Sequence, residues 1–263
     1  MSTRAASHRS AGEGSGERVE GRNPVLEALR GPREVKRIYV GKGAGKSPSI
    51  EEIFALAGNA GIPVEEIDRR RLEDMSRTAS PQGVIADVEP YTYLSLGELL
   101  ESVDPATSPM VLLLDGVEDP RNMGSLIRTA DAAGVSAVVI GKHRAAAVTP
   151  VVASASAGAV EHVRLARVPN IPEALRRLKD KGLWVFGAEE GASTPYYEAD
   201  LGLPLAIVLG GEGKGLSRLA AELCDFLVSI PMHGRVSSMN VSAAGAVLMF
   251  EAARRRDTAG GVA

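Results

Sequence analysis

Short apolar runs and segments of helical periodicity alternate along the chain from residue 109 onward. The first run, MVLLLD at 110–115, is continuously apolar, as expected for a strand buried on both faces of a sheet. Strands that alternate with helices predict a parallel sheet with helices on both faces. We expect further strands at SAVVIG, HVRLA, LWVFG, LAIVL and FLVSI, and helices over 122–133, 150–158, 172–182, 215–223 and 238–256.

A smaller unit with its own alternation precedes that sheet. Helical patterns in RNPVLEALR, SIEEIFALAGNAG and DRRRLEDMSR alternate with the candidate strands KRIYV, IPVEEI and GVIADVEP, which predicts a small α/β sandwich. Residues 1–17 are rich in Ser, Gly, Arg and Glu without apolar periodicity, which predicts disorder. We therefore expect an α/β protein with a disordered tail over 1–17, a small domain over 18–89, a linker over 90–108, a larger domain over 109–256 and a tail over 257–263.

Composition excludes several classes of protein. The single cysteine, Cys224, excludes a disulfide framework and any multi-cysteine metal site. The net charge is −3, and residues 19–88 carry eleven acidic and eleven basic side chains, so bulk charge gives no argument for nucleic acid. The N-terminus lacks the apolar core of a signal peptide, and no run of 18 apolar residues is present. We expect a soluble, cytoplasmic protein.

Two glycine-rich segments resemble phosphate-binding loops but fail the spacing. GKGAGKS at 41–47 needs a glycine at position 40, which is a valine. In GGEGKGLS at 210–217, the lysine is followed by Gly215 and not by serine or threonine. No Gly-x-Gly-x-x-Gly follows a strand either. The sequence therefore argues against a P-loop NTPase and a dinucleotide-dependent dehydrogenase.

The first polar motif lies after the MVLLLD strand. Asn122 stands where a helix N-cap is expected, and Arg128, six residues further on, is close enough to reach back toward the strand end. An alternative is that Asn122 only caps the helix and that Arg128 only pairs with Asp115 or Glu118.

Two more polar motifs follow the last two strands of the predicted sheet. Glu212 lies in the glycine cluster 210–213, where glycines permit close backbone approach to a ligand. The alternative is a tight turn with a solvated glutamate. Ser238, Asn240 and Ser242 open the last, otherwise apolar helix, and Ser238 is a candidate cap. Polar groups buried inside a helix need hydrogen-bond partners, so packing alone explains Asn240 and Ser242 poorly. These motifs follow the carboxyl ends of predicted strands, and in open α/β sheets ligands bind at that edge.

Together these motifs resemble those of the SpoU-type RNA ribose 2′-O-methyltransferases, members of the trefoil-knotted SPOUT class. The resemblance covers 109–256: an Asn…Gly…Arg helix start, Gly-Glu-Gly, Ile-Pro-Met and Ser-x-Asn-x-Ser occur in the family order. GRNPVLEAL and SPQGVIADV resemble the start and end of the family's small RNA substrate-binding domain. The combination resembles the bacterial subgroup that methylates a guanosine of 23S rRNA.

The resemblance implies methyl transfer from S-adenosylmethionine to a ribose 2′-hydroxyl, without a metal. Arg128 would deprotonate or orient the hydroxyl, although arginine has a high pKa for a base. Asn122 would position Arg128 or the ribose, Glu212 would hold the loop, and Ser238 and Asn240 would complete the catalytic site. A knotted C-terminal segment and a homodimer with shared active sites are also implied. The cofactor would lie against Gly187, Gly210, Gly211, Ile230, Met232 and Met239.

Basic side chains of the smaller domain are candidates for RNA contact, although charge runs are usually solvated faces. The alternatives within the enzyme class are a tRNA ribose 2′-O-methyltransferase and an antibiotic-resistance rRNA methyltransferase. A different class is an RNA-binding module without catalysis, which the joint presence of the polar motif residues disfavours. The candidate RNA-binding residues are Arg30, Arg33, Lys36, Arg37, Lys42 and Lys46, with the run Arg69–Arg71 beside them.

Overall fold

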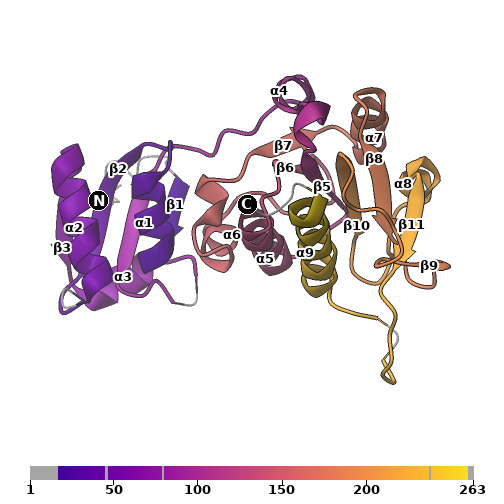
Figure 1. The fold of residues 1–263 in the computed structure, drawn as a ribbon. Helices are drawn as coiled ribbons and strands as arrows, with labels where there is room; N and C mark the ends of the chain where they lie inside the picture. The colour runs from indigo at the N-terminus through magenta and orange to yellow at the C-terminus, as the bar shows by residue number, and fades with distance from the viewer. Residues whose placement is uncertain (1–16, 45–46, 79, 237, 260–263) are drawn as a thin grey trace, which may run out of the picture.

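The larger domain is built on a parallel sheet with the strand order β7-β6-β5-β10-β8-β11-β9 (Figure 1). The structure of the whole chain is a computed structural model, which describes residues 17–44, 47–78, 80–236 and 238–259. Every strand pair of this sheet is parallel, which confirms the predicted class. The strands are β5 (Met110–Asp115), β6 (Ala137–Gly141), β7 (Leu165–Val168), β8 (Trp184–Ala188), β9 (Thr194–Pro195), β10 (Leu205–Gly210) and β11 (Phe226–Ser229).

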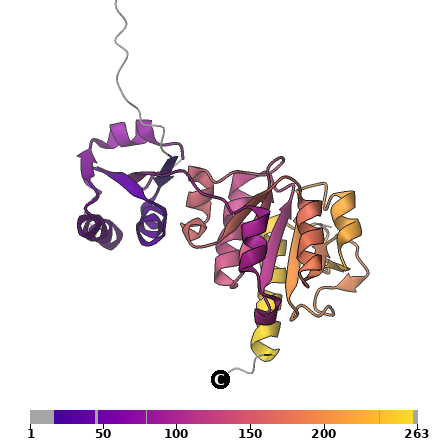
Figure 2. The ribbon, with the colours of Figure 1, turned by 90° about the horizontal axis from the view of Figure 1, so that it is seen from above.

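Helices cover both faces of this sheet because the central strands are apolar on both sides. In β5, Leu112 and Leu114 pack into one hydrophobic cluster, whereas Val111 and Leu113 pack into another. Figure 2 shows the resulting layers from above. The first cluster includes residues of α5 (Pro120–Ala132), α6 (Pro150–Ala155) and α9 (Val241–Ala259), and the second includes residues of α4 (Leu96–Ser102), α7 (Ile171–Asp180) and α8 (Arg218–Leu223).

The smaller domain contains a four-stranded sheet in the order β1-β4-β2-β3. Strand β1 pairs antiparallel with β4 and was not predicted from the sequence. Glu17 is its first residue, so the predicted tail ends at least one residue too late, and residues 1–16 lie outside the described residues. The remaining elements match the predicted order: α1 (Arg22–Arg30), β2 (Val35–Gly41), α2 (Pro48–Ala60), β3 (Val64–Ile67), α3 (Arg69–Met75) and β4 (Val84–Val88), with β1 at Glu17–Glu20.

The segment between the two sheets is anchored to the larger domain. The hydroxyl of Tyr91 donates to the carbonyl of Val163 at 3.2 Å, and that of Tyr93 accepts from the amide of Val148 at 2.7 Å. Leu94 forms a parallel bridge with Ala166 of β7, before α4 and a short 3-10 helix, η1 (Pro105–Thr107). This connection therefore extends the edge of the larger sheet.

Helix α9 differs from its predicted bounds at both ends. It begins at Val241 and not at 238, and it continues to Ala259, so residues 257–259 belong to a helix and not to a tail. Residues 260–263 lie outside the described residues. Within the described part of the chain, no helix combines the length and apolar character needed to span a membrane.

Candidate active site

The polar motifs meet at the carboxyl edge of the larger sheet. Gly210 ends β10 directly beside Asp115, the last residue of β5. A cavity of about 830 Å³ opens at this edge, within the range typical of ligand sites. Its lining includes Ala188, Glu189, Glu190, Leu209, Gly210, Gly211, Glu212, Lys214, Val228, Ile230, Met232, Ser238, Met239, Asn240 and Val241.

Glycines are required in the loop that carries Glu212. A Cβ atom on Gly210 would lie 2.0 Å from the carbonyl carbon of Gly215, and one on Gly211 would lie 2.2 Å from the carbonyl oxygen of Gly116. Gly215 also has a φ of 62°, a left-handed conformation that favours glycine. The loop thus folds tightly upon itself and against the loop after β5, which fixes the position of Glu212.

Three side chains from distant segments form one hydrogen-bond network. The amide nitrogen Nδ2 of Asn122 donates to Oε1 of Glu212. The Nδ2 atom of Asn240 donates to Oδ1 of Asn122 at 3.1 Å and is 3.5 Å from Oε1 of Glu212. These residues come from α5, the loop after β10 and the start of α9. The structure therefore brings together three of the five predicted catalytic residues.

The helix caps differ from those predicted. Asp119, and not Asn122, caps α5: its side chain accepts from the backbone amides of Arg121 and Asn122. Asn240, and not Ser238, caps α9, because its Oδ1 accepts from the amides of Ser242 and Ala243. The prediction that Asn240 lies inside the helix is therefore wrong. Because Asp119 caps the start of α5, the side chain of Asn122 is not needed as a cap and binds Glu212 instead.

Arg128 does not join this network within one chain. It is exposed on α5, and among the described residues no ion pair is found between it and Asp115 or Glu118. Six residues at about 100° each place it about 120° around the helix from Asn122, so the two side chains leave α5 in different directions. Asp115 instead accepts from the backbone amide of Ser217 at 2.8 Å, at the start of α8.

The predicted cofactor-binding residues separate into two groups. Five of them, from the two strand ends and the following loops, line the cavity: Gly210, Gly211, Ile230, Met232 and Met239. Gly187 is not among the lining residues. A Cβ atom there would lie 2.6 Å from Sγ of Cys224 and within 3 Å of Leu216 and Leu227, so close packing explains this glycine.

Sequence reasoning missed Glu189, which follows β8 at the same edge of the sheet. It lines the cavity, and its Oε2 atom is buried without a hydrogen-bond partner among the described residues. A buried carboxylate oxygen normally has a donor nearby, so this atom favours a ligand that supplies one. The sequence did offer a signal for Glu189, because it comes just after a predicted strand, as Glu212 does.

Arg33 is a structural residue and not the RNA contact that the sequence suggested. Its guanidinium forms a buried ion pair with Glu161 of the larger domain, in the 3-10 helix η2 (Ala159–Glu161), and also contacts Glu17 at 3.2 Å. The two paired side chains are only 7% and 1% exposed. The guanidinium also lies over the ring of Tyr91. Arg33 therefore connects the two domains and is inaccessible to RNA.

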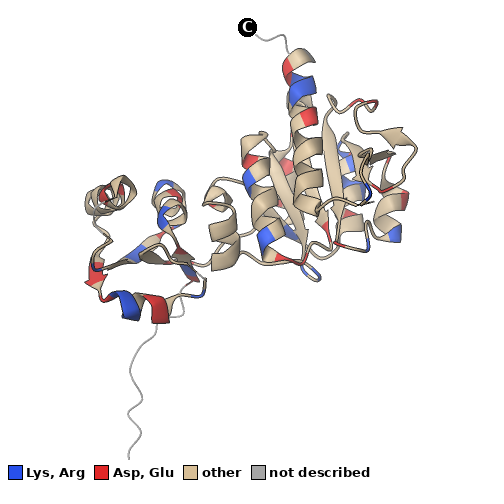
Figure 3. Cartoon of the chain, turned by 90° about the horizontal axis from the view of Figure 1, so that it is seen from below, with Lys and Arg blue, Asp and Glu red and all other residues tan. Residues whose placement is uncertain are grey.

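Arg30, Lys36, Arg37 and Lys42 lie on the surface in ion pairs, as do Arg69 with Glu73 and Arg71 with Glu65. Figure 3 shows basic and acidic residues interspersed over this domain. Exposed pairs are weak, so a phosphate can compete for these cations. Lys46 lies outside the described residues. The other pairs are Arg30 with Glu27 and Glu52, Lys36 with Glu89, Arg37 with Glu65, and Lys42 with Asp68.

Comparison with known families identifies the class of protein. Residues 109–250 match the SpoU rRNA Methylase family, and residues 18–94 match the RNA 2′-O ribose methyltransferase substrate binding family. The chain belongs to the SpoU methylase family, as its motifs indicated. It is 43% identical over 244 residues to the 23S rRNA (guanosine-2′-O-)-methyltransferase RlmB of Pseudomonas putida, covering 91% of this chain and 97% of that protein.

Solved structures show the same two-part architecture. The SpoU methyltransferase AviRb from Streptomyces viridochromogenes superposes with a TM-score of 0.78 at 25% identity, covering 93% of this chain and 91% of that one. An AdoMet-bound rRNA methyltransferase from Sinorhizobium meliloti gives a TM-score of 0.74 at 27% identity, covering 90% of this chain and 87% of that one. Both matches include the smaller domain as well as the parallel sheet.

Proposed function

We propose that this protein transfers the methyl group of S-adenosylmethionine to a ribose 2′-hydroxyl of 23S rRNA, with a guanosine as the target nucleotide. The observation that carries the proposal is the network of Asn122, Glu212 and Asn240 beside the cavity. The relative from Pseudomonas putida, similar over nearly its whole length, supports the choice of RNA and nucleotide. Ribosomal RNA is found where ribosomes are made, so we place the enzyme in the cytoplasm.

The cavity suits the chemistry of S-adenosylmethionine. Its lining carries three carboxylates, Glu189, Glu190 and Glu212, against one amine, Lys214, and the cofactor carries a net positive charge. The orphaned Oε2 of Glu189 offers an acceptor for a hydroxyl or ammonium group of the ligand. Ile230, Met232 and Met239 provide apolar contacts. The residues present therefore fit this cofactor.

The bound cofactor supplies an electrophilic methyl group that needs alignment more than activation. The protein must then orient the ribose hydroxyl and accept its proton, because a hydroxyl with a high pKa is a poor nucleophile. Asn122, Glu212 and Asn240 restrain one another, so the site is organised before RNA arrives. Ser238 lines the same cavity and contributes a further hydroxyl.

We assign Arg128 to the active site of a second copy of the chain in a homodimer. It is exposed and turned away from the network of its own chain, as a residue serving a neighbouring site would be. Helices α5 and α9 pack side by side, and the ring of Phe250 on α9 is 51% exposed, which offers an apolar contact for the second copy. An arginine beside the reacting hydroxyl would stabilise the developing alkoxide.

We also propose that the C-terminal segment forms a trefoil knot. Strand β10 lies between β5 and β8 although it follows both in the chain, and α9 packs back against α5. These features support a chain that threads through an earlier loop. Such a topology is rare, and general rules of chain connection disfavour it.

Methyl transfer in vitro tests the proposal. Purified protein is incubated with radiolabelled S-adenosylmethionine and either 23S rRNA or tRNA from a strain that lacks the gene. We expect label in 23S rRNA that resists base hydrolysis at one phosphodiester, as a 2′-O-methylated ribose does. Label in tRNA alone would support the alternative tRNA enzyme, and label in neither RNA would contradict the proposal.

A further inference from the structure

Two segments of the smaller domain that carried the family resemblance lie next to each other in space. Arg22 belongs to GRNPVLEAL and Gln82 to SPQGVIADV, 60 residues apart. The backbone amide of Arg22 donates to Oε1 of Gln82 at 3.2 Å, and its side-chain Nε donates to the Gln82 carbonyl oxygen at 3.2 Å. The amide of Gly21 also donates to the carbonyl of Val84. None of these bonds belongs to the network around Glu212.

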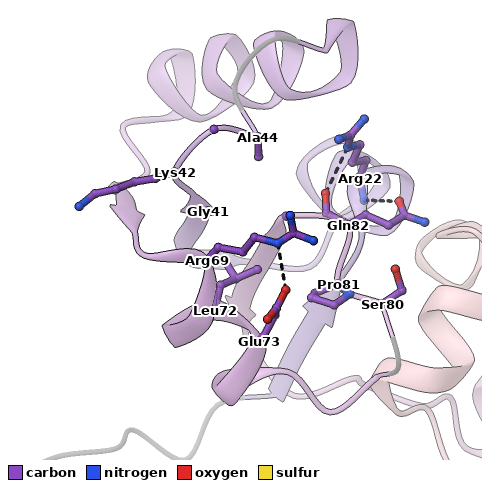
Figure 4. Close-up of a pocket in the computed structure, with 12 residues that line it drawn as sticks. Arg22, Gly41, Lys42, Ala44, Arg69, Leu72, Glu73, Ser80, Pro81 and Gln82 are labelled. Carbon is purple, nitrogen blue, oxygen red and sulfur yellow. Dashed lines mark hydrogen bonds and ion pairs between the residues drawn. The ribbon is translucent and has the colours of Figure 1, made fainter.

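A second cavity, of about 730 Å³, opens beside these two segments. Figure 4 shows the Arg69 guanidinium pointing toward the loop that holds Pro81, with Lys42 extending away from it. The lining has three basic side chains, Arg22, Lys42 and Arg69, and one acidic side chain, Glu73; Lys42 is paired with Asp68 and Arg69 with Glu73, which leaves Arg22 as the cation without an ion pair among the described residues. This excess of positive charge occurs in a domain whose basic and acidic side chains balance in number.

Both arginines are held so that the ends of their guanidinium groups remain available. Arg22 uses Nε to bind Gln82, and Arg69 uses Nε to bind Glu73 at 3.0 Å. Among the described residues, no hydrogen bond involves the terminal nitrogens of either group. A guanidinium oriented in this way matches the oxygens of a phosphate with two parallel hydrogen bonds.

The backbone around the cavity is strained where it meets these arginines. Gln82 has a φ of 51°, in the left-handed region that side-chain-bearing residues seldom adopt. The next residue, Gly83, has a φ of 83°, and a Cβ atom there would lie 2.8 Å from Cβ of Ala44. Strain of this kind accumulates at binding sites, where the surrounding structure holds it in place. Here the amide of Val84 donates to the carbonyl of Pro81, so Gln82 and Gly83 form a tight turn, and the Gln82 side chain accepts from the amide of Arg22.

We propose that this cavity binds one nucleotide of a single-stranded segment of the RNA substrate. Arg22 and Arg69 hold its phosphate, and the amide group of Gln82 contacts the neighbouring base or ribose. Single-stranded RNA offers unstacked bases to such groups, whereas an A-form duplex keeps its major-groove base edges in a deep, narrow groove that side chains cannot read. The assignment rests on the proposed function, and it gives the smaller domain a defined RNA-binding site in addition to surface charge.

The test measures filter binding of full-length protein to protein-free 23S rRNA from a strain that lacks the gene, over about 50–200 mM salt. We expect the double variant Arg22→Ala/Arg69→Ala to bind about tenfold more weakly and to lower the slope of log K against log salt by about 0.7 for each phosphate that the protein no longer neutralises. The matched control is Arg176→Ala/Arg218→Ala, which likewise removes two arginines, both exposed and each paired with a glutamate of its own helix in the larger domain. It should bind within about twofold of the unaltered protein.

A second variant keeps the test decisive if the first fails to fold. Gln82→Gly removes the side chain and relieves the positive φ, which offsets the lost hydrogen bond to the Arg22 amide, so its stability should stay close to that of the unaltered protein while it binds RNA about threefold more weakly. Affinity for S-adenosylmethionine should stay unchanged in all variants.

Unaltered RNA affinity and salt slope in the Arg22→Ala/Arg69→Ala variant, or equal losses in the control, would overturn the assignment. If that double variant fails to fold, unaltered RNA affinity in Gln82→Gly would overturn it instead. If the unaltered protein neither binds nor methylates 23S rRNA, the proposed function itself fails.

Discussion

The side-chain amide of Asn122 donates a hydrogen bond to the carboxylate of Glu212, 90 residues further along the chain. This bond joins the start of α5 to the loop after β10, and Asn240 at the start of α9 closes the group. The three residues follow β5, β10 and β11 at the carboxyl edge of the parallel sheet, which is why side chains so distant in sequence can meet. The proposed chemistry depends on this group remaining intact.

Removing the negative charge of Glu212 should impair methyl transfer more than cofactor binding. We expect Glu212→Gln to lower kcat for methyl transfer about tenfold or more, because Asn122 and Asn240 both lose their charged acceptor. Steady-state kinetics with 23S rRNA measure this, and calorimetry follows cofactor affinity. The control Glu198→Gln changes an exposed glutamate outside the cavity. Equal kcat in Glu212→Gln and the unaltered protein would remove Glu212 from the mechanism.

Arg128→Ala should abolish methyl transfer while leaving cofactor binding intact. A mixing experiment then tests whether Arg128 acts on the second copy. If the active site is shared, random dimers of Arg128→Ala and Asn240→Ala chains should recover about a quarter of full activity, since half are mixed and each mixed dimer has one complete site. No recovery on mixing would place Arg128 and Asn240 in the same chain's site, and a loss of cofactor binding would mean that Arg128 is structural.

Much of the architecture was predictable because it follows from local pattern. Continuous apolar strands such as 110–115 and the alternation of helices specify a parallel sheet without reference to distant residues. The four-residue β1 was missed because ERVE has little apolar character, and it is held by pairing with β4. The two-residue β9 gives too short a signal for any periodicity.

Part of the candidate site was predictable in its residues but not in its contacts. Asn122, Glu212 and Asn240 could be selected because polar groups at strand ends and helix starts have local signatures. Their mutual hydrogen bonds depend on strand order, which the sequence pattern does not specify. The same limit applies to Arg33, whose burial against Glu161 is created by the packing of one domain on the other, and to the packing role of Gly187.

The buried pair of Arg33 and Glu161 should make stability depend on pH. Arg33→Ala leaves a buried carboxylate unpaired, so we expect a loss of about 3–5 kcal/mol in the free energy of unfolding at pH 7. Burial raises the pKa of Glu161, with Arg33 opposing that rise, so removing Arg33 should raise it further. The loss should therefore shrink as the pH falls below the folded pKa and Glu161 becomes neutral.

Urea unfolding at pH 5 and pH 7 measures this dependence. The double variant Arg33→Met/Glu161→Gln is the control, because it removes both charges and should recover most of the stability. A loss of equal size at both pH values would show that the carboxylate is not the source of the effect.

Gly187→Ala distinguishes packing from cofactor binding. The new methyl group would meet Sγ of Cys224 and the side chains of Leu216 and Leu227, so we expect a loss of about 1–3 kcal/mol in unfolding free energy. Affinity for S-adenosylmethionine, measured by calorimetry on the folded protein, should change little. Gly58→Ala, on α2 with open space around it, should instead stabilise slightly. If Gly187→Ala instead weakens cofactor binding at unchanged stability, Gly187 belongs to the cofactor site as the sequence suggested.

A map of ribose methylation in the cell tests the proposed function most directly. Primer extension at low nucleotide concentration is compared on 23S rRNA from the parent strain, a strain lacking the gene, and that strain carrying either the unaltered gene or Asn240→Ala. We expect one stop at a guanosine that is present in the parent, absent from the deletion strain and restored only by the unaltered gene. Identical patterns in all four strains, or a change confined to tRNA, would contradict the proposed function.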